Sequence, residues 1–308
     1  MINMIFYSNN SSIPKYVRYY FWFMLTILSI FFAEVISAST PYAFLKFSDF
    51  IALSLIYGLH ILVLGGIVYA YGEPSFKTLY PAGVLFGLYE AYITKVLFHP
   101  WWHAALNIGG ISVFEVLTIA MFWHPLMSFM VPLQVAQMFT KDRKVFLRFV
   151  FEHPLVFAVF CGVIEGMGTQ NIGVSVVSLL SGFLVVFVVL GVWIFILHGD
   201  RYDMKALMPQ GKEIGVLAIM LLLLYIVLGF LWRLESLSGI YAQMFIWGLY
   251  AFFGWLLYRN LKRTGFPVRS ELPNKILIVG IVYFVFIVTL SSVLTCILYI
   301  NIPTLMWF

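Results

Sequence analysis

Residues 173–198 read GVSVVSLLSGFLVVFVVLGVWIFILH and contain no Asp, Glu, Lys or Arg. An α-helix of about 20 apolar residues is long enough to cross the hydrocarbon core of a bilayer. Mostly apolar runs of similar length lie at 19–38, 50–71, 79–98, 149–166, 215–232, 240–258 and 276–300. The sequence therefore predicts an all-α fold, that of a polytopic integral membrane protein.

The composition excludes the main alternatives. Of the 308 residues, 63% are hydrophobic and 10% are charged, whereas about a quarter of the residues of a soluble domain are charged. A soluble, disordered or nucleic-acid-binding protein is therefore excluded, and the lipid bilayer is the expected partner. Cys161 and Cys296 are too few for a disulfide framework or a CxxC metal motif, so we expect two small apolar residues. The residues indicate no oligomeric state.

The stretch 104–140 decides the number of helices, because it is long for one helix and contains Trp123-His124-Pro125. As one kinked span near 110–138, it gives nine helices. Nearly all loop Lys and Arg residues then fall on one side of the membrane, and only Lys46 and Arg233 on the other. Cytoplasmic loops collect Lys and Arg. We therefore predict a multi-pass protein of the cell membrane with a cytoplasmic N-terminus and an outer C-terminus, and the net charge of +5 is a sign of this topology.

Ionisable side chains at membrane depth are costly and usually face a bundle interior or a water-filled cavity. Residues 1–308 form a single predicted transmembrane domain, in which 1–170 holds the polar site and 171–308 mainly supplies scaffold helices. The ionisable residues predicted at membrane depth are Glu34, His60, Glu90, Lys95, Glu115, His124 and Glu165. All four glutamates fall in the outer half, which predicts a polar cavity open to the outside. The alternative is that each glutamate is protonated and hydrogen-bonded as a packing contact.

Glu90 is the strongest candidate for a functional residue, because two glycines share its helix face. Gly83 and Gly87 precede it at positions i and i+4, with Glu90 at i+7, and small residues at this spacing predict a closely packed neighbouring helix. Lys95 is expected either to pair with a carboxylate or to extend its ammonium outward. Glu165 has a similar companion pair, Gly162 and Gly166, but it is nearer a helix end and therefore cheaper to hydrate.

The histidines allow two interpretations each. His60 is predicted to be a satisfied interior histidine rather than a ligand. His99 and His103 flank Pro-Trp-Trp and indicate an interfacial aromatic anchor; the alternative is a metal site, with Asn107 one turn further on if the segment is helical. His124, at the proline kink, either satisfies a freed backbone carbonyl or takes part in catalysis.

Residues 87–95, GLYEAYITK, resemble the EExxxR signature of the CPBP family, the intramembrane proteases of the CAAX-processing and bacteriocin-processing type. Glu90 matches the first glutamate, Ala91 replaces the second, and Lys95 replaces the arginine. His124, one helix later, matches the first histidine of that family. A later histidine motif of the family has no match in the expected helix. The resemblance is confined to residues 1–140 and rests on short motifs.

The resemblance implies a glutamate that activates water, histidines that stabilise an oxyanion or bind a divalent metal, and a peptide substrate. The catalytic candidates are therefore Glu90, His124 and Lys95. Counting along the predicted helices puts Glu90 in the outer half of the membrane and His124 in the inner half, so the two are expected at different depths.

Two other functions stay open, and with them the question whether the protein is an enzyme. The membrane glutamates Glu34, Glu90 and Glu115 are typical of a proton- or cation-coupled carrier of a small solute, although no internal repeat or pair of broken helices is visible. The third hypothesis is a helical scaffold or assembly subunit.

Overall fold

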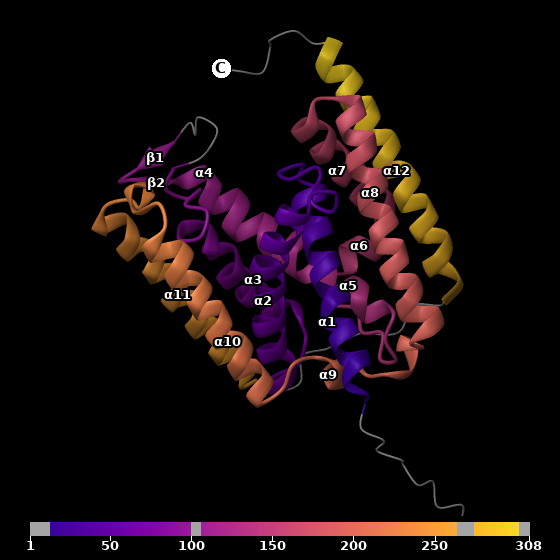
Figure 1. Ribbon diagram of the computed structural model, residues 1–308, viewed down its shortest axis with the longest axis horizontal. Coiled ribbons are helices and arrows are strands. Elements are labelled where there is room, and N and C mark those ends of the chain that lie inside the picture. The colour runs from indigo at the N-terminus through magenta and orange to yellow at the C-terminus, as the bar shows by residue number, and fades with distance from the viewer. Residues whose placement is uncertain (1–12, 100–105, 264–273, 302–308) are drawn as a thin grey trace, which may run out of the picture.

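The computed structural model describes residues 13–99, 106–263 and 274–301, and these are helical for most of their length (Figure 1). Within these described ranges, six continuous helical stretches are long and apolar enough to cross a membrane. They are Lys15–Val35, Phe47–Tyr71, Val113–Met138, Ile172–Ile196, Lys212–Leu231 and Ile240–Leu261. The chain is thus a membrane protein of nearly all-α structure.

The six stretches are assembled from α-helices and π-helical extensions. Three α-helices continue as π-helices: α1 (Lys15–Ile30) over Phe31–Val35, α8 (Ile172–Gly191) over Val192–Ile196, and α10 (Lys212–Leu224) over Tyr225–Leu231. α2 (Phe47–Tyr71) and α11 (Ile240–Leu261) are α-helical throughout. The other helices are α3 (Phe76–Gly87), α6 (Arg148–Glu152), α7 (Pro154–Thr169), α9 (Met204–Leu207) and α12 (Asn274–Asn301). Every predicted apolar run is therefore helical over most of its described residues.

The stretch 104–140 forms one continuous helix over Val113–Met138, as predicted. α4 (Val113–Glu115) passes into a π-helix over Val116–Met130 that contains Pro125, and α5 (Val131–Met138) completes it. Proline removes a backbone donor and crowds the preceding turn, and wider π-type turns are one way in which a helix accommodates such a break. We call this continuous helix the 113–138 helix.

A small β-hairpin precedes the 113–138 helix. β1 (Asn107–Ile108) pairs antiparallel with β2 (Ile111–Ser112). The turn between them consists of Gly109 and Gly110, with φ of 59° and 85°. Two-residue hairpin turns with positive φ at both positions favour glycine. The hairpin replaces the first turn of the span that was expected to start near residue 110.

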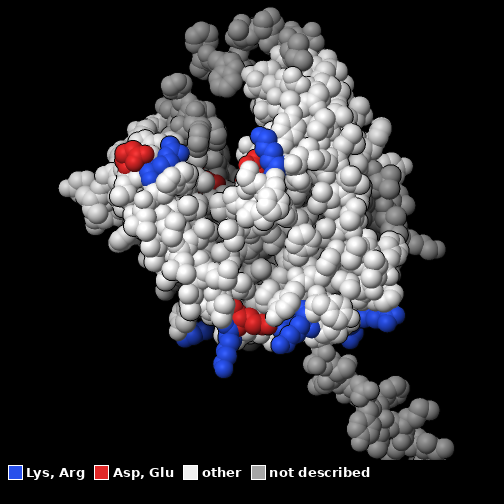
Figure 2. Space-filling model, in the orientation of Figure 1, with Lys and Arg blue, Asp and Glu red and all other residues white. Residues whose placement is uncertain are grey.

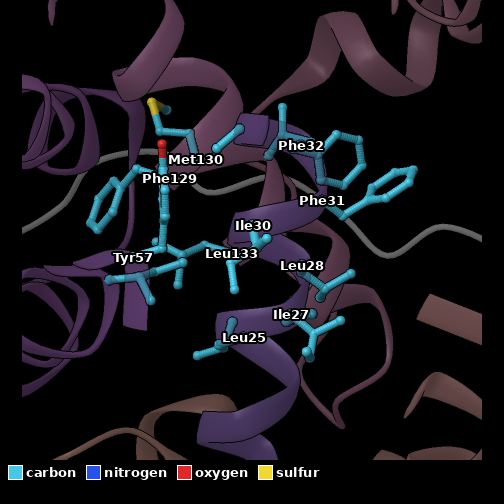
Figure 3. Close-up of a cluster of buried hydrophobic side chains, with 14 of the residues drawn as sticks. Leu25, Ile27, Leu28, Ile30, Phe31, Phe32, Tyr57, Phe129, Met130 and Leu133 are labelled. Atoms are coloured by element: carbon cyan, nitrogen blue, oxygen red, sulfur yellow. The ribbon is translucent and has the colours of Figure 1, made fainter. Parts of the chain in front are cut away.

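Figure 1 shows α10 and α11 along one flank of the molecule and α7, α8 and α12 along the other. α1, α2 and α3 lie between the flanks; α1 packs on α2, and α3 packs on the 113–138 helix. Figure 3 shows the apolar cluster around α1, in which Leu25 and Ile30 lie near Leu133. α1 is thus a central helix, although it is the first in the chain.

Most charged side chains on the face seen in Figure 2 lie along the end of the molecule where α1 begins and α9 lies. At this end, Arg18 donates to both carboxylate oxygens of Glu213, at 2.8 and 2.6 Å, and to the carbonyl of Met208 at 3.0 Å. The first turns of α1 and α10 are therefore held at the same end of the molecule.

Candidate functional site

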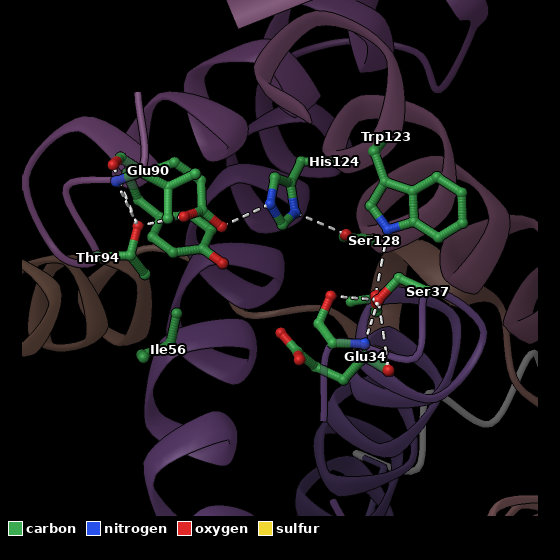
Figure 4. Close-up of polar contacts among 12 residues, drawn as sticks. Glu34, Ser37, Ile56, Glu90, Thr94, Trp123, His124 and Ser128 are labelled. Carbon is green, nitrogen blue, oxygen red and sulfur yellow. Dashed lines mark hydrogen bonds and ion pairs between the residues drawn. The ribbon is translucent and has the colours of Figure 1, made fainter. Parts of the chain in front are cut away.

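Glu90 lies just beyond α3, in a 3₁₀ turn over Leu88–Ala91. Its side chain is 7% exposed, and its Oε1 is 2.8 Å from Nε2 of His124, which is 3% exposed (Figure 4). A carboxylate oxygen accepts hydrogen bonds, so the Nε2–H of His124 is the donor in this contact. The structure therefore brings together the two residues that the sequence had placed at different depths.

The prediction of different depths was wrong because it ignored how the two helices pack. A Cβ on Gly83 would lie 2.6 Å from Cα of Pro125, and one on Gly87 would lie 2.5 Å from the carbonyl oxygen of Ala120. The backbones are thus in direct contact, as the glycine spacing predicted, and they run antiparallel. Helical side chains lean toward the N-terminus of their own helix. In this antiparallel pair, the side chains of His124 and Glu90 therefore lean toward each other.

Hydroxyl groups fix both members of the pair. Oγ of Ser128, one turn along the same helix, is 2.7 Å from Nδ1 of His124. With Nε2 as the donor to Glu90, Nδ1 accepts from this hydroxyl. The hydroxyl of Thr94 donates to Oε2 of Glu90. Because both ring nitrogens and both carboxylate oxygens have partners, the imidazole and the carboxylate are held in one mutual orientation.

A second buried carboxylate, Glu34, lies close to this pair on the π-helix after α1. Oε2 of Glu34 accepts from the hydroxyl of Thr40 at 2.7 Å, and Oε1 accepts from the hydroxyl of Tyr57. Tyr57 OH lies 2.9 Å from Tyr89 OH, and the Tyr89 ring is 5.0 Å from that of His124. Two glutamates from different helices therefore belong to one buried group of acids, phenols and imidazole.

His60 is a satisfied interior histidine, as expected. Its Nδ1 is 2.6 Å from the carbonyl oxygen of Ile56, and its Nε2 is 3.1 Å from the hydroxyl of Tyr225. The ring stacks on Phe86, with centroids 4.8 Å apart, and Phe86 in turn stacks on His124 at 5.7 Å. His60 therefore forms part of the wall of the site without bonding to Glu90.

Lys95 does not contact Glu90, contrary to the expectation that it pairs with a carboxylate or extends outward. Its ammonium donates to the carbonyl oxygens of Leu228 and Trp232, at 2.8 and 2.9 Å, and the residue is only 2% exposed. The last carbonyls of a helix have no partners within it, and Lys95 supplies donors where the helix that begins with α10 ends. It neither pairs with a carboxylate nor extends outward, and its ammonium instead completes the end of another helix.

Three further candidates lie apart from the pair. Glu115 is fully buried in α4 and accepts from the hydroxyl of Ser112, not from any residue of the Glu90 group. Asn107 is exposed and accepts from the amide of Gly110 in the hairpin turn, so it lines no cavity. His99 is also exposed. His103, its predicted partner in a metal site, lies outside the described residues.

Glu165 occupies a separate buried cluster between α7, α8 and α12, where it accepts from the hydroxyls of Ser175 and Ser292. Cys161 and Cys296 are free and buried, as expected, rather than joined in a disulfide. The expectation that all four glutamates share one cavity is therefore wrong. Only Glu34 and Glu90 lie in the same group of contacts, because the helices that carry Glu115 and Glu165 direct them to other interfaces.

The donor set at Glu90 does not fit a resident divalent metal. Catalytic metal sites generally use three protein ligands, whereas the described residues contain no group of three or more His, Cys, Asp and Glu that could hold a metal ion. Nδ1 and Nε2 of His124 are also both engaged, by Ser128 and by Glu90. We therefore derive no chemistry through a metal at this pair.

An apolar cavity of about 190 Å³ lies elsewhere, between α1 and helices α5 to α8 and α12. Its lining includes Leu28, Phe31, Phe157, Phe183 and Phe284, and no polar side chain. It lacks any group able to bind or activate a polar substrate, so the Glu90 group is the better candidate for chemistry.

A profile of a family described as an uncharacterized membrane protein family matches residues 23–306. This chain belongs to that family. It is also similar to an uncharacterized protein of Archaeoglobus fulgidus, with 30% identity over 252 residues, which cover 79% of this chain and 78% of the relative. No solved structure matches significantly. The family match spans both the Glu90 group and the Glu165 cluster.

Several hydroxyl groups of the site were not identified from the sequence. Thr94 and Ser128 follow Glu90 and His124 by four residues, the spacing at which helical side chains meet, so this pattern was a usable signal. Tyr57 and Tyr89 reach the site from different helices, and nothing in the local sequence indicates that contact.

Proposed function

We propose that this membrane protein is a CPBP-like intramembrane peptidase in which Glu90 is the general base and His124 its orienting partner. The observation that carries the proposal is the 2.8 Å contact between Glu90 Oε1 and His124 Nε2 in a buried site. A general base must be held within reach of the proton it removes and in a tuned environment. Glu90 and His124 are the two residues that match the CPBP motifs, and they are the two whose side chains are in contact.

In the proposed reaction, Glu90 takes a proton from a water molecule as the water oxygen bonds to the carbonyl carbon of a peptide bond. His124 holds the carboxylate through its Nε2–H, and the hydroxyl of Tyr89, whose ring lies 5.0 Å from that of His124, is the proposed donor for the developing oxyanion. The C–N bond then breaks as the leaving nitrogen takes up the proton from Glu90. The substrate is a peptide within or at the membrane.

The proposal includes the finer topology: nine spanning helices in the cell membrane, a cytoplasmic N-terminus and an outer C-terminus. Support comes from the charge distribution of the loops and from the Arg18–Glu213 ion pair, which holds two predicted cytoplasmic helix ends together. Cysteine-accessibility labelling of residues added at each terminus of the full chain in intact cells tests it. Labelling of both termini from the same side would contradict the odd number of spans.

Cleavage of membrane peptides tests the catalytic part. The full chain is reconstituted into liposomes with a set of synthetic transmembrane peptides, and new peptide termini are read by mass spectrometry. We expect Glu90→Gln to lower the cleavage rate by at least about 100-fold, since a positioned base contributes that much. The matched control is Glu115→Gln, which changes a buried glutamate outside the site and should cleave normally. No cleavage by the wild type, or equal cleavage by Glu90→Gln, would refute the peptidase.

A proton-coupled carrier of a small solute is the second candidate, and a specific observation favours it. Glu34, Tyr57 and Tyr89 form a row of hydrogen-bonded, protonatable groups beside Glu90 and His124, and such rows occur in proton relays. Proteoliposomes would then take up solute in response to a pH gradient, and Glu34→Gln would abolish that response. If neither cleavage nor uptake is found, the scaffold hypothesis is favoured, with the glutamates as packing contacts.

A further inference from the structure

The Glu165 cluster lies where α7, α8 and α12 meet, away from the Glu90 group, and does not depend on the proposed function. Glu165 is fully buried. Its Oε2 accepts from Ser175 at 2.7 Å and from Ser292, and the two hydroxyl oxygens are 2.6 Å apart. Its Oε1 accepts no hydrogen bond from any residue that the structure describes. Half of the carboxylate is therefore buried without a protein partner.

A second polar group beside the cluster is also unsatisfied. Ser178 follows Ser175 by three residues on α8 and hence on the same helix face. Its side chain is fully buried, and its hydroxyl has no hydrogen-bond partner among the described residues. Buried polar groups without partners are costly, most of all in a bilayer. An unsatisfied oxygen of the Glu165 carboxylate and an unsatisfied hydroxyl one helix turn from its partner Ser175 point to a ligand that binds oxygen atoms.

The helices around Glu165 pack too closely to admit an organic ligand. A Cβ on Gly162 would lie 2.4 Å from the carbonyl oxygen of Val288, and one on Gly166 would lie 2.6 Å from that of Ser292. α7 and α12 are therefore in backbone contact on both sides of the turn that carries Glu165. A contact this close excludes an organic molecule and is compatible with a single ion.

The carboxylate has no basic neighbour along α7 or α8, which contain no Lys, Arg or His. The basic residue of α12, Lys275, is at the first turn of that helix, several turns before Ser292. An ionised carboxylate at membrane depth needs a positive partner. The donors are carboxylate and hydroxyl oxygens, which suit a hard cation rather than a transition metal, and a single negative charge is neutralised by a monovalent one.

We propose that Glu165, Ser175, Ser178 and Ser292 form a binding site for Na⁺ that joins α12 to α7 and α8. The bound ion neutralises Glu165 and gives the unsatisfied carboxylate and Ser178 oxygens a partner. Glu165 lies one turn before the end of α7 at Thr169, so the ion has only a short distance to travel from that end of the helix. The site contributes to the stability of the three-helix flank and takes no part in the chemistry at Glu90.

Thermal unfolding of the purified full chain tests the proposal. Unfolding is followed in choline chloride, in KCl and in increasing NaCl at constant ionic strength and pH. A ligand that binds only the folded state raises Tm with its concentration, and we expect Na⁺ to raise it by about 2 °C or more over choline. Equal Tm values in the three salts would overturn the proposal. So would a Tm that responds to pH and not to Na⁺, because Glu165 would then bind a proton.

Substitutions in the proposed site test whether Na⁺ binds to these residues. Glu165→Gln should remove the response to Na⁺, whereas Glu115→Gln, which changes another buried glutamate, should keep it. If Glu165→Gln does not fold, Ser178→Ala serves instead, because it removes a hydroxyl that no described residue binds. We expect Ser178→Ala to fold and to need at least about threefold more Na⁺ for the same rise in Tm. An unchanged Na⁺ response in Ser178→Ala would show that the donor set is wrong.

Discussion

Gly83→Ala tests the packing that brings Glu90 and His124 together. The added Cβ would lie 2.6 Å from Cα of Pro125, 3.0 Å from its carbonyl oxygen and 3.1 Å from its Cβ. Two of these three contacts are with backbone atoms, which cannot rotate away as a side chain does. α3 and the 113–138 helix must therefore move apart at this point.

The size of the movement follows from the contact distance. Carbon atoms pack at about 3.5–4.0 Å, so the shift needed at Pro125 is about 0.9 Å at the least. If the whole shift is passed on, the bond between His124 and Glu90 lengthens from 2.8 Å to about 3.7 Å, beyond hydrogen-bond range. Overpacking of this kind costs about 1–3 kcal/mol, which corresponds to a fall in Tm of about 2–10 °C.

Thermal unfolding in detergent or nanodiscs measures this loss, and the chain offers a matched control. Gly254, within α11, has no atom within 4 Å of the place where a Cβ would stand. Gly254→Ala should therefore be neutral or stabilise the protein by up to about 1 kcal/mol, because alanine favours the helix. If Gly83→Ala is as stable as Gly254→Ala, the direct backbone contact does not exist, and the explanation for the meeting of the pair fails.

Two further predictions concern contacts outside the site. Lys95→Met should lower the free energy of unfolding by about 1–3 kcal/mol, because two carbonyl oxygens lose the ammonium that binds them; an unchanged denaturation midpoint would contradict this. Arg18→Ala and Glu213→Ala should each cost no more than about 1 kcal/mol, since both side chains are partly exposed. A double-mutant cycle should show a double variant less destabilised than the sum of the two, and strict additivity would argue against the ion pair.

The helical segments could be predicted from hydropathy because a membrane helix is a local property of about 20 consecutive residues. The single helix over 113–138 was predicted in spite of Pro125, because splitting it would have placed basic loops on the wrong side. The ends of segments were less accurate. The run 79–98 is regular α-helix only as far as Gly87 and then turns through a 3₁₀ segment, a change that hydropathy does not reveal.

Rarity and spacing singled out Glu90 and His124, which the structure places in contact, whereas the predicted difference in their depths was wrong. The glycine pair that marked the face of Glu90 is also what allows the contact with Pro125 and Ala120. Lys95 had the spacing expected of a site residue, but its ammonium donates to the carbonyl of Leu228 near the end of another helix. Sequence spacing defines the face of a helix but does not reveal what that face contacts.

The sequence by itself determined that this is a membrane protein, where its apolar helices run, and which few ionisable residues lie among them. These follow from hydropathy and charge, which are summed over neighbouring residues. Only the tertiary structure decided that Glu90 meets His124, that Glu34 joins them through tyrosines, and that Glu165 belongs to a separate cluster. The reason is that such contacts depend on the rotation, depth and separation of helices distant in the chain, and these are set by close backbone contacts such as that of Gly83 with Pro125.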